Sequence, residues 1–121
     1  MFRLGIIEES LSDDAVFETL KEYFYPERTE RVDGDECPLW HVREYRVPDE
    51  KMSETAKAIT AVVKKTWYVH GFNENELCVI LCGKYFVLPP KRCFKWREMI
   101  RYGAKHAEVD KKYLKNIQLH I

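Results

Sequence analysis

The sequence predicts an α+β fold, a two-layer sandwich in which a mostly antiparallel sheet carries two to three helices on one face. Apolar residues recur at helical spacing in three segments, while the segments between them alternate or run apolar as strands do. The chain has 121 residues, 45% of them hydrophobic, which suits one domain with one core. No repeat, linker or low-complexity tract divides the sequence, so we expect residues 1–121 to form a single domain.

Residues 2–7 are expected to form the first strand, and their nearly continuous apolar character suggests a central position in the sheet. Ser12 is then suited to cap a helix, in which apolar residues recur at helical spacing from Val16 onward. We therefore expect a helix over about residues 13–24, closed by Pro26.

The next segment, residues 29–47, predicts an irregular hairpin. Its two halves, 29–32 and 39–47, are rich in residues that favour strands, and Asp33-Gly34-Asp35 between them is a turn signal. The pattern leaves the register of this hairpin open.

A second helix is expected to begin at Pro48-Asp49, where proline suits the first turn. Its apolar stripe consists of Met52, Ala56, Ile59 and Val63. At Thr66 the spacing of apolar residues changes from that of a helix to that of strands. Residues 66–88 predict a three-stranded antiparallel meander with polar turns at 73–75 and 83–84.

Pro89-Pro90 breaks the sheet and predicts a third helix over about residues 91–102, with Gly103 as the residue that terminates it. We expect its inward side chains to be Cys93, Trp96 and Ile100. Asp110 can cap a short final turn that runs through Leu114, and residues 117–121 alternate as in a terminal strand.

The resulting order of elements is similar in outline to ferredoxin-like topology, with an added meander and a third helix. Only the order of elements carries this similarity, because no motif supports it. A topology of this kind does not specify a function.

Charge is divided unevenly along the chain, although 20 basic and 20 acidic residues cancel in sum. Residues 1–60 hold 15 acidic and 8 basic side chains, whereas residues 61–121 hold 5 acidic and 12 basic ones. A net charge of zero removes the repulsion that keeps monomers apart. We therefore expect a homodimer in which acidic and basic regions are matched across the contact, with a separate protein partner as another possibility.

Basic and aromatic residues are interleaved in and around the expected third helix. The candidate residues for binding nucleic acid or another anion are Lys91, Lys95, Arg97, Arg101 and Lys105. The competing interpretation, which we favour, is the solvated face of an amphipathic helix. The sequence pI of about 6.9 is well below the value of about 9 typical of a dedicated nucleic-acid domain.

Aromatic residues also gather on the expected strands, and if the helices cover only one face of the sheet, some of these residues must lie on the open face. The candidate pocket or interface consists of Trp40, Tyr45, Trp67, Tyr68, His70 and Phe72. The alternative is that these residues fill an ordinary core.

Cysteine and histidine invite a metal or a catalytic interpretation, but their spacing supports neither. Cys78 and Cys82 are separated by an apolar run within one expected strand, unlike the tight CxxC turns of zinc sites. Cys93 lies close to Lys91 and Arg92, which would favour a thiolate, yet its place on the apolar stripe predicts a core residue. We expect reduced thiols, no metal site and no cofactor, and we assign no catalytic residue.

The longest mainly apolar run, residues 77–82, is far shorter than the roughly 20 residues that cross a bilayer. The first ten residues reach two glutamates without the apolar region or small-residue cleavage site of a signal peptide. We therefore expect a cytoplasmic protein without membrane contact.

Three functional hypotheses follow. The first is a non-enzymatic binding or regulatory domain that self-associates through the aromatic sheet face. The alternative is binding of nucleic acid or a phosphate ligand through the basic third helix. The third is a small enzyme that uses His70, Tyr68 and Cys93.

Overall fold

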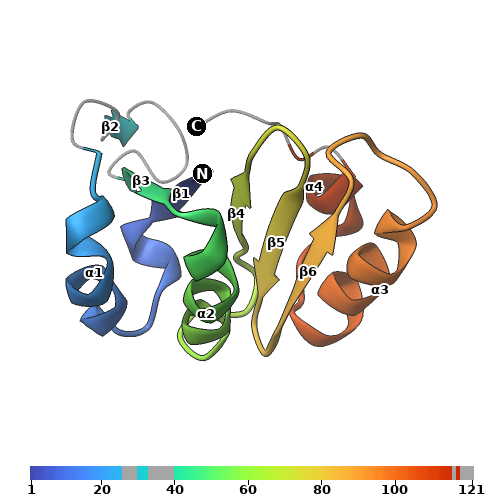
Figure 1. Ribbon diagram of the computed structural model, residues 1–121. Coiled ribbons are helices and arrows are strands. Elements are labelled where there is room, and N and C mark those ends of the chain that lie inside the picture. The colour runs from blue at the N-terminus through green and yellow to red at the C-terminus, as the bar shows by residue number, and fades with distance from the viewer. Residues whose placement is uncertain (26–29, 33–39, 116, 118–121) are drawn as a thin grey trace.

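The structure is a computed structural model that describes residues 1–25, 30–32, 40–115 and 117. Its fold is a mixed α+β fold built around an antiparallel sheet (Figure 1). In chain order the elements are β1 (Phe2–Ile7), the 3-10 turn η1 (Glu8–Ser10), α1 (Ala15–Leu20), the 3-10 turn η2 (Lys21–Tyr23), β2 (Glu30–Val32), β3 (Trp40–Val47), α2 (Asp49–Thr60), β4 (Val69–Phe72), β5 (Leu77–Leu81), β6 (Lys84–Leu88), α3 (Trp96–His106) and α4 (Lys111–Lys115).

The sheet has six strands in the order β2-β3-β1-β4-β5-β6, and every neighbouring pair is antiparallel. β1 lies between β3 and β4, which confirms its expected central position. The expected hairpin of residues 29–47 forms as the pair β2 and β3, with Arg31 opposite His41. Its expected turn at residues 33–35 lies outside the described residues.

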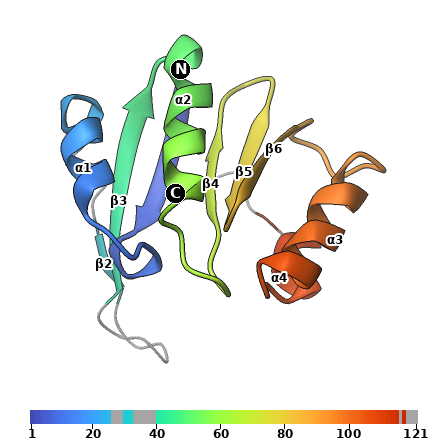
Figure 2. The same cartoon turned by 90° about the horizontal axis from the view of Figure 1, so that it is seen from below.

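Helices cover both faces of this sheet, which corrects the expectation of helices on one face. α1 and α2 pack on one face, over β3, β1 and the near sides of β4 and β5. α3 and α4 pack on the opposite face, over β5 and β6 (Figure 2). The two-layer description therefore fails at β5, which lies between helices.

β5 explains why the second helical layer is needed. All five of its residues are buried, and they divide between two cores by the alternation of a strand. Cys78 and Ile80 belong to the core under α1 and α2, whereas Leu77, Val79 and Leu81 belong to the core under α3 and α4. A strand that is apolar on both sides is stable only when both faces are covered.

The first helix is shorter than expected, and Ser12 does not cap it. α1 ends at Leu20 and continues only as the tighter turn η2. The backbone N–H of Ala15 donates to Asp13 Oδ1 at 2.7 Å, while the Ser12 hydroxyl donates to the carbonyl of Val62 instead. Asp13 therefore satisfies the first turn, in place of the expected Ser12.

α2 follows the expectation closely. It begins directly after Pro48, and the expected stripe residues Met52, Ala56 and Ile59 are buried. The fourth stripe residue, Val63, is also buried but lies beyond the end of the helix.

α3 begins five residues later than expected and continues through Gly103. The indole N–H of Trp96 donates to the carbonyl of Pro89 at 2.9 Å, which anchors the first turn of α3 to the end of β6. Trp96 and Ile100 are buried as expected, but Cys93 is exposed in the preceding turn. Gly103 lies inside α3, so the expectation that this glycine terminates the helix is wrong.

The C-terminal part agrees with the sequence where it is described. The backbone N–H of Lys112 donates to Asp110 Oδ1 at 3.0 Å at the start of α4, as expected for a capping aspartate. Ile117 is buried in the core under α3 and α4. Residues 118–121 of the expected terminal strand lie outside the described residues. Among the described residues, no helix combines the length and the apolar character needed to cross a membrane.

Candidate functional site

The candidate site is the surface formed by the turn before α3 and by the outward side of that helix. Six exposed cationic side chains share it, and we call them the basic α3 surface: Lys91, Arg92, Lys95, Arg97, Arg101 and Lys105. The helix buries Trp96, Met99, Ile100 and Gly103 on its other side. The sequence predicted all of these except Arg92 as anion-binding candidates, and the structure places Arg92 and Arg97 beside one hollow.

None of the six cations forms an ion pair with a described residue. The acidic residue in α3, Glu98, pairs with Lys84 at 3.8 Å between carboxylate and ammonium. This carboxylate therefore reaches across to β6. The positive charge of the surface is therefore uncompensated within the described residues.

Several of these cations lie where they oppose the helix dipole. Lys95 is the N-cap residue of α3 and makes no side-chain capping bond, and Lys91, Arg92 and Arg97 lie within a few residues of it. Cations near a helix N-terminus are unfavourable, by about 0.3–1 kcal/mol each at an exposed position. An anion bound among them would relieve this repulsion.

A shallow hollow of about 330 Å³ lies within this surface, lined by Arg92, Cys93, Phe94, Arg97 and Ile100. Two guanidinium groups and one aromatic ring therefore border the same space. The Phe94 side chain is 72% exposed, an unusual degree for a large apolar ring. Guanidinium groups suit phosphate and exposed rings suit bases, so the hollow has the chemistry of a nucleotide contact.

The hollow does not assemble the expected Cys/His enzyme site. Among the described residues, no histidine or carboxylate lines the hollow beside Cys93. His70 lies in β4, where its ring stacks on Phe72 at 6.3 Å and is tilted against Tyr68 at 6.1 Å. Burial raises the pKa of the Tyr68 hydroxyl, which opposes its use as a base.

The aromatic residues predicted as one sheet-face pocket are divided between the two faces. Tyr45 is buried on the side of α1, where its ring stacks on Phe17 at 6.4 Å. Tyr68 and Phe72 pack on the side of α3 and α4. Trp67 precedes β4 and packs against the core under α1 and α2, and the side chain of Trp40 lies outside what the structure describes.

β1 and β3 carry a buried ionic cluster that sequence reasoning missed. Glu44 is 0% exposed and accepts bonds from Arg3 at 3.2 Å and Arg46 at 2.7 Å. The Arg3 guanidinium also lies 5.4 Å from the centre of the Phe72 ring. The alternation of charge along β3 was the available signal, but only the register that sets Gly5 opposite Glu44 places Arg3 beside it. Two arginines on one carboxylate indicate a structural cluster.

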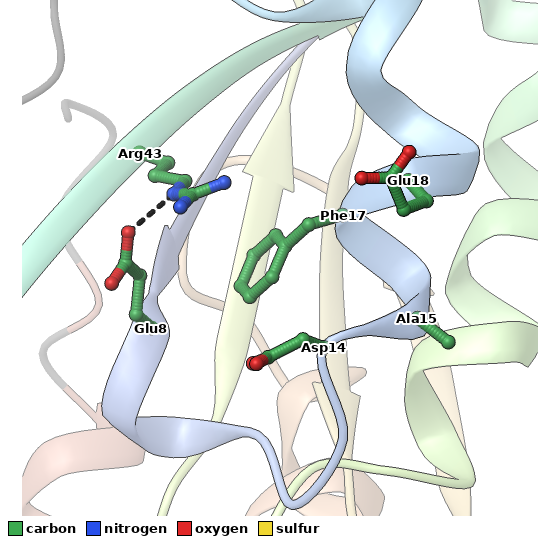
Figure 3. Close-up of a pocket in the computed structure, with 6 residues that line it drawn as sticks. All are labelled: Glu8, Asp14, Ala15, Phe17, Glu18 and Arg43. Atoms are coloured by element: carbon green, nitrogen blue, oxygen red, sulfur yellow. Dashed lines mark hydrogen bonds and ion pairs between the residues drawn. The ribbon is translucent and has the colours of Figure 1, made fainter.

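A second hollow, of about 350 Å³, lies beside α1 (Figure 3). Its lining residues are Glu8, Asp14, Ala15, Phe17, Glu18 and Arg43. Glu8 accepts from Arg43 Nε, and the Arg43 guanidinium lies 4.5 Å from the centre of the Phe17 ring. Burial alone would lower the pKa of Arg43, but hydrogen bonds to Tyr45 and Glu8 outweigh it and raise that pKa.

This second hollow therefore holds an internally compensated pair and no obvious ligand position. The described residues contain no group of three or more side chains placed to hold a metal ion. Of the four cysteines, Cys78, Cys82 and Cys93 are free thiols, as expected, and Cys37 lies outside the described residues.

Three comparisons with known proteins were made, and no family model, curated protein or solved structure matches this chain.

Proposed function

We propose that this protein is a non-enzymatic binding domain whose ligand is single-stranded nucleic acid, held on the basic α3 surface. One observation carries the proposal. Six exposed cations form no ion pair with a described residue, and two of them, Arg92 and Arg97, border one hollow with Phe94, a ring that is 72% exposed. Proteins that bind single strands combine these two elements, a positive track for the backbone and rings on which bases stack.

The spacing along α3 supports an extended ligand. Arg97, Arg101 and Lys105 follow one another at four-residue intervals, so they lie in a row along one side of the helix. Successive members are about 6 Å apart along the axis at 1.5 Å per residue. Arg92 and Phe94 lie before the helix start and border one hollow with Arg97. A strand laid along this row would therefore meet several cations and one stacking ring.

The net charge of zero does not weaken this proposal, because most acidic residues lie elsewhere and Glu98 of α3 is paired with Lys84. Exposed acidic residues such as Glu18, Glu50 and Glu54 belong to α1 and α2. Those helices cover the opposite face of the sheet from α3 (Figure 2). The field near the basic α3 surface is therefore set mainly by its own cations, since charges farther than about 8–10 Å are screened at physiological salt.

The experiment is a salt titration of binding to a fluorescent single-stranded oligonucleotide. The double variant Arg97→Ala, Arg101→Ala should bind more weakly and should lower the slope of log K against log salt by about 1.4, or about 0.7 for each lost phosphate contact. A matched control removes two exposed lysines on the side of α2, Lys57→Ala with Lys64→Ala. Equal binding by the double variant and the wild type, or no binding by the wild type, would refute the proposal.

The strand order supports a ferredoxin-like interpretation of the first part of the chain. The sheet order β2-β3-β1-β4, with α1 between β1 and β2 and α2 between β3 and β4, is that expected of a doubled, split βαβ unit. In this interpretation β5, β6, α3 and α4 are the additions, and they carry the proposed site. Cytoplasmic residence also remains part of the proposal, on the sequence alone.

The self-association expected from the aromatic sheet face is not proposed for that face. Tyr45 and Phe72 belong to opposite cores, so the aromatic residues do not form one exposed surface.

A further inference from the structure

We propose that the protein forms a homodimer by antiparallel pairing of β6 with β6 of a second copy, which joins the two sheets edge to edge. This inference is independent of the nucleic-acid proposal, because it concerns a strand edge and not the basic α3 surface. Among the residues that the structure describes, β6 is the last strand of the sheet, and β5 is its only neighbour. Its other side therefore presents backbone groups to solvent.

The register of the β5–β6 hairpin determines which groups those are. Leu81 and Lys84 are paired across the two-residue turn of Cys82 and Gly83, so they exchange both backbone hydrogen bonds. The alternation of an antiparallel ladder then directs Phe86 toward β5 as well. The backbone N–H and C=O of Tyr85 and Val87 point away from β5, toward the free edge.

No described residue takes up these outward groups. Neither Tyr85 nor Val87 has a backbone hydrogen bond outside the β5–β6 pair. The strand also lacks the usual protection of an edge, since it contains no proline, its pairing with β5 is continuous without a bulge, and its single charge is Lys84 at one end. Val87 is 51% exposed. An unprotected apolar edge of this kind is a template for another strand.

A second copy fits this edge in one register. With the two-fold axis at Phe86, Tyr85 lies opposite Val87 of the other copy, so both outward residues of each strand form hydrogen-bonded pairs. An axis at Tyr85 would set Val87 opposite Gly83, whose N–H is bonded to Thr60. An axis at Val87 would set Tyr85 opposite Pro89, which has no N–H.

The side chains and charges suit the same register. Phe86 would meet Phe86 of the second copy in the close, non-hydrogen-bonded position, and Tyr85 would meet a β-branched valine, both favourable cross-strand pairs. Lys84 would lie opposite Leu88, so the two strand cations do not face each other. The formal net charge of zero leaves no overall repulsion between copies. These points favour β6 of a second copy, and not a strand of another protein, as the occupant of this edge.

The test is the molar mass in solution, measured by light scattering for the wild type and three variants at position 87. Val87→Pro removes only the outward N–H, which an edge strand tolerates, and Val87→Lys adds a charge at the contact. Both should have the monomer mass of 14.5 kDa, half the mass of the wild-type dimer. Val87→Thr keeps the β-branched shape and the backbone, so it should remain a dimer.

A residue-level measurement keeps the test decisive if Val87→Pro fails to fold. In the wild type, amide hydrogen exchange at Tyr85 and Val87 should slow as protein concentration rises, whereas Phe86, already bonded to β5, should stay protected at all concentrations. A wild type that is monomeric throughout, a dimer unaffected by Val87→Lys, or concentration-independent exchange at Tyr85 and Val87 would each overturn the proposal. The double variant Arg97→Ala, Arg101→Ala should remain dimeric, which separates the two proposals.

Discussion

At the scale of residues, the turn before α3 shows how a helical pattern can mislead. Cys93 lies three residues before Trp96 and seven before Ile100, a spacing that predicts a buried position. Because α3 begins only at Trp96, the period does not extend back to Cys93. Cys93 and Phe94 are exposed instead, and this exposure creates the hollow of the candidate site.

Replacement of Phe94 by alanine should weaken binding of a single-stranded oligonucleotide by about 1–3 kcal/mol, the contribution of one stacked base. The stability of the Phe94→Ala variant should hardly differ from that of the wild type, since the ring is mostly exposed. Fluorescence anisotropy and a thermal melt measure the two effects. Tyr113→Ala, an exposed aromatic residue of α4, is the control. Unchanged affinity of Phe94→Ala would remove stacking from the proposed function.

The thiols should differ sharply in reactivity. Burial, with a smaller contribution from Glu76, raises the pKa of Cys78 from 9.0 to about 12, whereas the exposed Cys93 is open to reagents. Alkylation at pH 8 followed by mass spectrometry should label Cys93 quickly and Cys78 only after unfolding. Rapid labelling of Cys78 in the folded protein would contradict its buried position.

The same shift gives a pH dependence of stability. Above pH 9 the unfolded state loses the Cys78 proton while the folded state keeps it, so the unfolded state binds fewer protons. The free energy of unfolding should therefore fall as pH rises from 9 toward about 12. Denaturant titrations of wild type and Cys78→Ala at pH 7 and pH 10 would show a smaller loss in the variant.

At the scale of elements, the packing of α4 against α3 depends on the close approach of Leu114 to Gly103. Gly103 is buried inside α3, and a Cβ at this position would lie 2.3 Å from Leu114 Cδ1 of α4. The helix thus tolerates glycine, at a cost of about 1 kcal/mol against alanine, so that α4 can pack closely. The sequence predicted a helix in the region of α3 and a short turn in the region of α4, but it assigned Gly103 the more common role of a helix terminus.

Gly103→Ala should therefore destabilise the protein by about 1–3 kcal/mol, as overpacking does, despite the better helix propensity of alanine. Chemical denaturation measures the change. The double variant Gly103→Ala, Leu114→Ala should lose less stability than the two single variants do in sum, because removal of the leucine side chain makes room for the new methyl group. If the loss of stability in the double variant equals the sum of the two single losses, the two positions do not interact.

At the scale of the whole molecule, the structure separates what the composition cancels. The acidic residues of α1 and α2 and the cations of α3 lie on opposite faces of the sheet. The unequal charge counts of residues 1–60 and 61–121 indicated that acidic and basic residues are separated along the sequence, but they did not show on which face of the sheet each group lies. The apolar run of residues 77–82 was a signal for helices on both faces, because a central strand without polar positions must be covered twice.

The sequence by itself determined the elements of this protein, because hydrophobic period, proline positions and capping residues act locally. The central β1, the β4–β6 meander, α2 and the Asp110 cap followed from such signals. Tertiary structure alone decided which face each helix covers, that Glu44 lies between Arg3 and Arg46, and that β6 is left as an edge. These features depend on how segments that are distant in the sequence cross and pair. The spacing of apolar residues, two in a strand and 3.6 in a helix, tells which side of an element is buried but not which other element covers it.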